Sequence, residues 1–130
     1  IRLTFFDIFS DKTKQFGFKA VFPSGKVLAC LGDEPFNEKC RNFVQNCDYL
    51  MCEAFCLYSQ KDIFKPYEKF HSTALDAGKL AESLFAKNLI LYHTEDETLQ
   101  TRKSTYTSEA RTVFNGAFLV PDDFEVIDLK

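Results

Sequence analysis

The chain has 130 residues, of which 45% are hydrophobic and 27% charged, and its formal net charge is −3. That length suits a single hydrophobic core, and the composition is too apolar for a disordered chain. The negative net charge argues against a protein that holds nucleic acid by bulk electrostatic attraction, and the short apolar runs exclude a transmembrane helix. We therefore expect one globular domain that does not enter a membrane.

The start of the chain and its cysteines indicate the context in which it folds. The chain begins at Ile1 and lacks a secretory signal pattern, so we expect it to belong to a longer polypeptide. Its five cysteines form an odd set, which favours free thiols in the cytoplasm over a disulfide framework. Residues 47–56 hold three of them, and a zinc cluster is the alternative there. Because no C-x-x-C pair is present, we favour buried free cysteines.

The first half of the chain predicts an antiparallel meander. Apolar-rich segments at residues 3–9, 16–22 and 26–31 are separated by short polar turns, which is typical of three consecutive antiparallel strands. Apolar residues then recur with helical spacing from Phe36 to Cys47. Residues 49–52 follow as a short buried strand.

The second half predicts helices that alternate with strands. Ser72 and Thr73 open a helix that extends to Phe85, and residues 88–92 form a fully apolar strand. We predict a further helix from about Thr105 to Phe114, followed by a terminal hairpin of residues 118–120 and 124–129. Because strands come first and then alternate with helices, the predicted fold class is α/β, with α and β elements mixed.

Four polar residues stand out because of their position relative to the predicted strands. Asp33, Glu53 and His93 each come at or just after a strand end, and His71 precedes the helix that leads to the last of these strands. If the strands lie side by side, these side chains converge on one edge of the sheet, where ligand sites form. Asp, Glu and His side chains bind metals and transfer protons. Each residue alone also fits an ordinary turn or a solvated loop, but both histidines of the chain belong to the set.

These residues lie in four motifs: Gly32-Asp33, Glu53-Ala54, His71-Ser72-Thr73 and His93. Their order, with steps of 38 residues from Asp33 to His71 and 22 from His71 to His93, resembles the metallo-β-lactamase-fold hydrolases of the ribonuclease Z-like branch. That branch has Gly-Asp-Thr, His-Glu-Ala, His-Ser-Thr and Thr-His motifs. The resemblance covers the whole chain and implies the C-terminal half of a four-layer αββα sandwich.

The resemblance implies a dinuclear metal-dependent hydrolase that attacks a phosphodiester with metal-bound hydroxide. Asp33 matches the carboxylate that bridges the two metal ions, and His93 matches a terminal metal ligand. His71 matches the histidine that donates a proton to the leaving oxygen, and Glu53 matches the acid that orients it. The implied cofactors are two divalent ions, with zinc as the first choice and manganese or iron as alternatives. The implied substrate is RNA or a small phosphodiester.

The chain also departs from the pattern of this branch. Glu34 replaces the threonine of Gly-Asp-Thr, Cys52 replaces the histidine before Glu-Ala, and Thr-Glu-Asp follows His93. The H-x-H-x-D-H ligand cluster, which lies upstream in the family, is not in this sequence. We therefore expect residues 1–130 to be a C-terminal portion, inactive alone, that exposes apolar surface and pairs with the N-terminal portion or with a second copy as a homodimer. The alternative is a non-catalytic scaffold or interaction module that keeps the fold.

Overall fold

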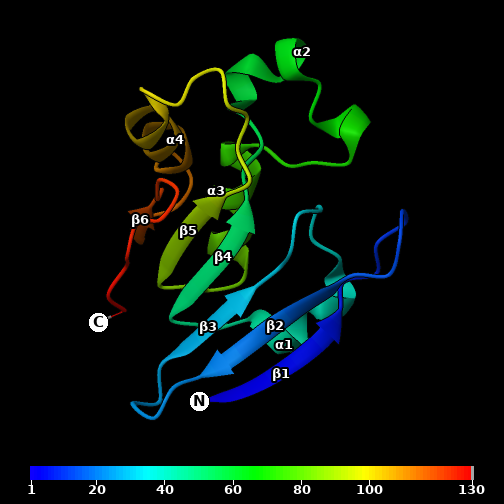
Figure 1. Ribbon diagram of the computed structural model, residues 1–130, viewed down its shortest axis with the longest axis vertical. Helices are drawn as coiled ribbons and strands as arrows, with labels where there is room; N and C mark the ends of the chain where they lie inside the picture. The colour runs from blue at the N-terminus through cyan, green and yellow to red at the C-terminus, as the bar shows by residue number, and fades with distance from the viewer. Residues whose placement is uncertain (130) are drawn as a thin grey trace.

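The computed structural model describes residues 1–129, and its strands form one six-stranded sheet (Figure 1). The strands are β1 (Arg2–Asp7), β2 (Phe16–Val21), β3 (Val27–Cys30), β4 (Tyr49–Glu53), β5 (Asn88–Tyr92) and β6 (Ala117–Leu119). They lie in the sheet in chain order. The pairs β1–β2 and β2–β3 are antiparallel, and the pairs from β3 to β6 are parallel. The predicted meander and the mixed α/β class are therefore confirmed.

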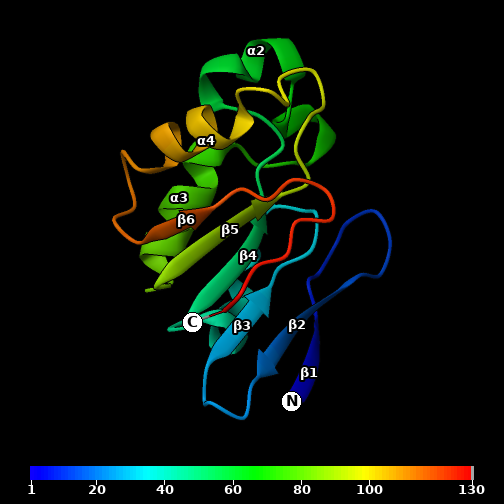
Figure 2. The same cartoon turned by 60° about the vertical axis from the view of Figure 1, so that its left-hand side comes forward.

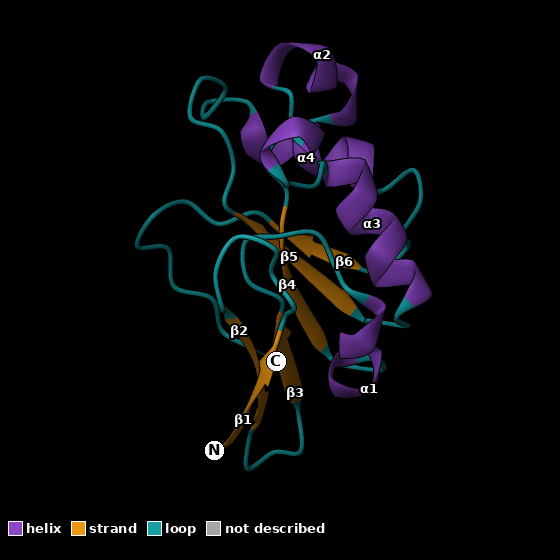
Figure 3. Ribbon diagram, turned by 90° about the vertical axis from the view of Figure 1, so that its right-hand side faces the viewer, coloured by secondary structure: helices purple, strands orange, loops and turns teal. Residues whose placement is uncertain are grey.

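Three of the four helices lie on one face of this sheet, and the second helix lies beyond the carboxyl ends of the parallel strands (Figure 1 and Figure 3). The helices are α1 (Arg41–Val44), α2 (Lys61–Phe64), α3 (Ala74–Ser83) and α4 (Arg102–Ala110), with 3-10 turns η1 (Glu38–Cys40), η2 (Tyr58–Gln60) and η3 (Tyr67–Lys69). Because parallel neighbours need a crossover connection, α1 lies between β3 and β4 in the chain, α3 between β4 and β5, and α4 between β5 and β6. No described helix has the length and hydrophobicity that crossing a bilayer requires.

The core lies between the sheet and these helices. Alternate residues of β4 and β5 point to this face and are at most 3% exposed: Leu50, Cys52, Leu89 and Leu91. They belong to one buried cluster with the alanines of α3, Ala74, Ala77 and Ala81. Small side chains on the helix allow its backbone to approach the sheet closely, so the three leucines and the cysteine fill the space between them.

Two predicted helices have different bounds in the structure. The helix predicted from Phe36 to Cys47 is limited to η1 and α1, because the backbone is extended at Gln45 and left-handed at Asn46, where φ is 59°. The last helix begins at Arg102, three residues earlier than predicted, and ends at Ala110. Helical spacing of apolar residues continued beyond the segment that is actually helical in both cases.

The helix that opens at Thr73 forms as predicted at its beginning but ends sooner. Thr73 caps α3 through a capping box with Asp76, which satisfies backbone donors at the first turn. The helix ends at Ser83 rather than at Phe85, which has a left-handed φ of 55° and is 70% exposed.

The predicted C-terminal hairpin is wrong. Residues 118–119 belong to β6, but β6 pairs parallel with β5, and residues 120–129 contain no strand. After β6 the chain runs as an irregular segment, drawn in red in Figure 2. Its turn at Pro121 and Asp122 is held by hydrogen bonds from Arg102 of α4 instead of by a second strand.

The sheet face opposite the helices carries exposed apolar side chains at the β1 and β2 end. Leu3, Phe5 and Phe16 are 52%, 65% and 56% exposed. Phe6 points to the other face, where it stacks on Phe43 of α1 at 4.8 Å between ring centroids. Several large exposed apolar side chains on one sheet face are more than single scattered surface residues, and larger apolar patches are typical of interaction sites. The expected exposed apolar surface is therefore present.

The five cysteines are all free, as predicted, and four of them are buried. Burial raises the pKa of the Cys47 and Cys56 thiols to about 11, and it raises the pKa of Cys52 further still. They behave as small apolar side chains of the core.

Asp48 joins the start of β4 to both neighbouring strands. Its Oδ2 accepts a hydrogen bond from the Val27 N–H at 2.8 Å, and its Oδ1 accepts one from Lys87 Nζ at 2.8 Å. Its backbone oxygen accepts a further bond from Asn88 Nδ2 at 2.7 Å. The Lys87 ammonium makes the largest contribution to lowering the pKa of Asp48. The carboxylate is therefore a charged junction between β3, β4 and β5.

Replacing this carboxylate should destabilise the fold in a pH-dependent way. We expect Asp48→Asn to lower the free energy of unfolding at pH 7 by about 1–3 kcal/mol, because an amide cannot accept from both donors. Since the folded state lowers the pKa of Asp48, its contribution is present above the unfolded pKa of about 3.9 and is lost as the pH falls through the folded value. Urea unfolding at pH 7 and at about pH 3 tests this. Asp62→Asn, at a side chain that is 86% exposed, is the control, and an equal loss there would contradict the prediction.

Candidate active site

The carboxyl ends of β4 and β5 bring two of the predicted site residues together. Glu53 is the last residue of β4 and lies opposite Tyr92, the last residue of β5, in the parallel register. His93 follows Tyr92 directly, and Asp33 follows the neighbouring strand β3 after a short turn. Because these three strands run parallel, their carboxyl ends form one edge of the sheet, and this is the position where ligand sites of such sheets occur.

Glu53 is the centre of the cluster. Its side chain is 2% exposed, and its Oε2 lies 2.7 Å from His71 Nδ1. His93 Nδ1 lies 3.4 Å from the same oxygen. The other oxygen, Oε1, accepts a hydrogen bond from the Ser72 N–H at 2.8 Å. The predicted contact between Glu53 and His71 is therefore present, and one buried carboxylate holds both histidines of the chain.

The backbone before α3 places His71 beside Glu53. Segment 72–74 runs alongside segment 54–56: the Phe55 N–H donates to the Ser72 oxygen at 2.9 Å, and the Ala74 N–H donates to the Cys56 oxygen at 2.9 Å. The Phe55 ring stacks on the His71 ring, with 4.9 Å between centroids and 20° between planes. This pairing fixes the position of the imidazole, and the stacking restricts its rotation.

The hydrogen-bond partners of His71 define its tautomer. Nδ1 lies 2.7 Å from Glu53 Oε2 and 3.1 Å from the backbone oxygen of Asp33. A carbonyl oxygen can only accept, so Nδ1 must carry the hydrogen. Nε2 is therefore the ring nitrogen left to act on a ligand.

Burial opposes charge on both members of the pair. It raises the pKa of Glu53, against the lowering effect of the Ser72 N–H and of His93. It lowers the pKa of His71, and the nearby Lys12 ammonium acts in the same direction, while Asp33 opposes them. Because each charge is penalised by loss of water, the short hydrogen bond between them is the main means by which either charge is accommodated.

Asp33 contributes to the site differently from the expectation. Glu53, His71 and His93 offer donor atoms that all lie within 4.8 Å of one another, and the Asp33 carboxylate is not part of this compact group. The backbone oxygen of Asp33 contacts His71 instead. Its carboxylate is near enough to contribute to the raised pKa of Glu53. Three of the four predicted side chains therefore converge, and the fourth residue borders them.

Comparison with known proteins identifies the fold. No family model matches the chain. The protein named Ribonuclease Z from Bacillus cereus is 32% identical over 98 residues, which are 75% of this chain and 31% of that protein. Human tRNase Z, short form, superposes with a TM-score of 0.71 at 25% identity over 98% of this chain and 43% of that one. The metallo-beta-lactamase fold protein YhfI from Bacillus subtilis superposes with a TM-score of 0.71 at 21% identity over 89% of this chain and 44% of that one.

The chain has the metallo-β-lactamase fold. Within that fold it resembles the ribonuclease Z-like branch, as the sequence motifs indicated. It spans only about a third of the length of the curated relatives it matches. Its six strands and the helices on one face are therefore part of a metallo-β-lactamase fold.

The donor set fits part of the metal centre that the metallo-β-lactamase fold implies. A metal-binding histidine commonly donates its other ring N–H to a carboxylate, and His93 turns Nδ1 toward Glu53 in this way. An imidazole from His93 and a carboxylate from Asp33 are ligands that zinc, manganese and iron accept. Glu53 and His71 are engaged with each other, and two ligands do not complete a stable zinc site. The residues thus fit as one side of a metal centre.

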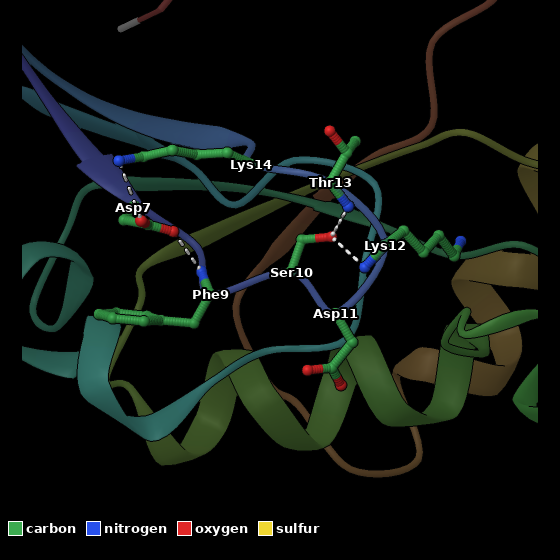
Figure 4. Close-up of a pocket in the computed structure, with 7 residues that line it drawn as sticks. All are labelled: Asp7, Phe9, Ser10, Asp11, Lys12, Thr13 and Lys14. Atoms are coloured by element: carbon green, nitrogen blue, oxygen red, sulfur yellow. Dashed lines mark hydrogen bonds and ion pairs between the residues drawn. The ribbon is translucent and has the colours of Figure 1, made fainter.

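A loop that the sequence presented only as a polar turn also lies in this part of the molecule. The β1–β2 loop surrounds a shallow pocket of about 390 Å³, in which Ser10 Oγ accepts from the N–H groups of Lys12 and Thr13 (Figure 4). The Lys12 side chain extends away from Asp7 in this view, and its Nζ donates to the Lys69 oxygen at 3.2 Å. Through Lys12 the loop contributes positive charge near His71. No sequence pattern indicated this, because the contact joins residues 57 positions apart.

Proposed function

We propose that this chain is the C-terminal portion of a metal-dependent phosphodiesterase of the ribonuclease Z-like branch. The observation that carries the proposal is the hydrogen bond between Glu53 and His71, next to His93 and in a chain with this fold. The relatives named Ribonuclease Z and tRNase Z support RNA as the substrate, with a small phosphodiester as the alternative.

Asp33 and His93 are the residues that would hold metal. We propose two divalent ions, with zinc as the first choice and manganese or iron as alternatives, for which Asp33 and His93 would supply this chain's ligands. When bound, such ions supply Lewis-acid activation of water and of the phosphate group. The remaining ligands would come from an N-terminal portion of the same fold.

His71 would act as the general acid. Its Nδ1 hydrogen is held by Glu53 and by the Asp33 oxygen, so Nε2 is the atom that donates a proton to the leaving oxygen. The leaving group of an RNA phosphodiester is an alkoxide, which leaves slowly unless it is protonated. Glu53 favours the protonated imidazole and keeps its orientation, and the Ser72 N–H holds Glu53 in turn.

The exposed apolar face of β1 and β2 supports a partner. Leu3, Phe5 and Phe16 would be covered by the N-terminal portion, or by a second copy of the chain in a homodimer. The free thiols support a location in the cytoplasm.

The test uses the longer protein in which this chain occurs, or the chain together with its copurifying N-terminal portion. We expect about two metal ions per assembly by elemental analysis, and hydrolysis of bis(p-nitrophenyl) phosphate and of an RNA oligonucleotide. Chelation should remove the ions and the hydrolysis together, and added zinc or manganese should restore both. A folded assembly with neither metal nor hydrolysis would contradict the proposal and favour a non-catalytic scaffold.

Glu53→Gln should disturb the tautomer of His71. The new amide has one acceptor and one donor end, but the site requires two acceptors, for Ser72 N–H and for His71 Nδ1–H. If the amide oxygen remains with Ser72, its NH₂ group faces His71 and forces the ring hydrogen onto Nε2. We expect a rate loss of about 10- to 100-fold and a changed imidazole pattern in 15N NMR spectra. Glu38→Gln, at an exposed surface pair, should leave both unchanged; an unaltered tautomer in Glu53→Gln would refute this account.

A further inference from the structure

Arg102 connects the residue after His93 to the C-terminal segment. Its Nη1 donates to Thr94 Oγ1 at 2.9 Å, and its Nη2 donates to the Pro121 oxygen at 3.0 Å and to Asp122 Oδ1 at 2.8 Å. The side chain is only 10% exposed. Both Nη groups are bonded, whereas the buried Nε has no hydrogen-bond partner among the described residues. Burying a guanidinium is costly, and the three bonds hold the two segments in one relative position.

The backbone at His93 requires such support. His93 has a φ of 53°, in the left-handed region that a residue with a Cβ rarely adopts. A strained conformation persists only where the surroundings hold it. On one side, the Glu95 N–H donates to the Phe55 oxygen at 2.7 Å. Thr94 lies between His93 and Glu95, and its hydroxyl accepts a hydrogen bond from Arg102.

The same contacts form the wall of a cavity beside His93. The cavity has a volume of about 310 Å³, and its lining includes His93, Thr94, Arg102 and Pro121. Arg102 therefore lies between the segment that carries His93 and the opposite wall. A change at Arg102 would move the wall and the histidine relative to each other.

Arg102 makes two kinds of contact, one to Thr94 and one to the C-terminal segment, and the neighbouring Lys103 makes only the second kind. Lys103 also holds the C-terminal segment, with Nζ 3.0 Å from Asp122 Oδ2 and a second ion pair to Glu125. No contact between Lys103 and Thr94 is present among the described interactions. Lys103 thus shares the attachment of the C-terminal segment with Arg102 but not the contact next to His93.

We propose that Arg102 is a positioning residue for His93, acting through the hydroxyl of Thr94. Its catalytic consequence rests on the proposed function, in which His93 binds metal. The geometric consequence does not, because it concerns only the orientation of an imidazole. The two can therefore be tested separately.

The first measurement is 15N NMR of the assembled protein in which only these 130 residues carry 15N-labelled histidine. The chain has two histidines, so two imidazole patterns are expected, and His71→Gln assigns them. Arg102→Lys and Thr94→Val should shift the His93 signals and leave those of His71 nearly unchanged. Lys103→Met should shift neither. The double variant Arg102→Lys/Thr94→Val should shift His93 no more than either single change, because both act through one contact.

The second measurement is catalysis by the assembled protein. Arg102→Lys and Thr94→Val should each lower kcat by about 10- to 100-fold with little change in KM, and Lys103→Met should not. Unchanged His93 signals in Thr94→Val, or an equal shift in Lys103→Met, would overturn the proposal. If the NMR shifts occur but the wild-type protein hydrolyses nothing, the positioning role stands and the proposed function fails. Thr94→Val keeps the buried guanidinium, so it remains informative if Arg102→Lys unfolds.

Discussion

Replacing His71 by alanine is expected to lower kcat by about 10²- to 10⁴-fold while the metal content stays unchanged. The reason is that the two ring nitrogens of His71 have different partners. Nδ1 is engaged by Glu53 and by the Asp33 oxygen, so only Nε2 is left for proton donation. Loss of a general acid removes rate without removing a metal ligand.

The size of that loss should depend on the leaving group. A nitrophenolate leaves without a proton, whereas the alkoxide of an RNA substrate needs one, so the loss should be much smaller for the nitrophenyl substrate. His71→Asn is the matched variant, because its amide can still donate to Glu53 but has no proton to transfer at the position of Nε2. It should retain stability and lose as much rate as the alanine variant. Loss of metal in either variant, or equal rate losses on both substrates, would show that His71 has another role.

His93→Ala should remove most activity on both substrates and about one metal ion per chain, because an imidazole ligand is lost from a site with few ligands. His93→Asn is the better variant for measurement. Asparagine tolerates the left-handed backbone found at His93, so it removes the imidazole with less strain than alanine. Elemental analysis and rates on the two substrates test the expectation.

The two histidines should therefore give opposite patterns. Unchanged metal content in His93→Asn, with a rate loss confined to the poor leaving group, would exchange the two assignments. A loss of the folded state in His93→Asn, seen as a lost thermal transition, would instead mean that the ring is needed for packing. The His93 side chain is 39% exposed, which argues against a need for the ring in packing.

The part of the site that could be predicted from the sequence is the part that depends on strand ends. The apolar runs before Glu53 and His93 are short and bounded by polar residues, so they indicate buried parallel strands. Neighbouring parallel strands have their carboxyl ends at the same edge of the sheet, so the meeting of the residues at these ends can be predicted without knowing any long-range contact. The contact of Glu53 with His93 follows from that arrangement, whereas His71 is placed by the pairing of segment 72–74 with segment 54–56.

The parts that could not be predicted depend on contacts between distant residues. Pro121 and Asp122 have the composition of a hairpin turn, but Arg102 of α4 binds both, and no local pattern reveals an acceptor 19 or 20 residues away. Asp33 follows a strand as expected, yet its backbone oxygen is what meets His71. The orientation of one side chain in a tight turn is not encoded in apolar periodicity.

The buried thiols can serve as probes of local unfolding in the chain. Cys47 precedes β4, and Cys52 and Cys56 flank Glu53, so these cysteines bracket the strand that carries the central carboxylate. A thiol-specific reagent can modify them only when the surrounding segment transiently unfolds. The modification rate at Cys52 and Cys56 then measures how often the sheet edge that carries Glu53 opens, and the rate at Cys47 measures the same for the opposite end of the strand. Metal, substrate or a partner that binds at this edge should slow the first rate and leave the second nearly unchanged, so the three buried cysteines show which end of β4 becomes more rigid on binding.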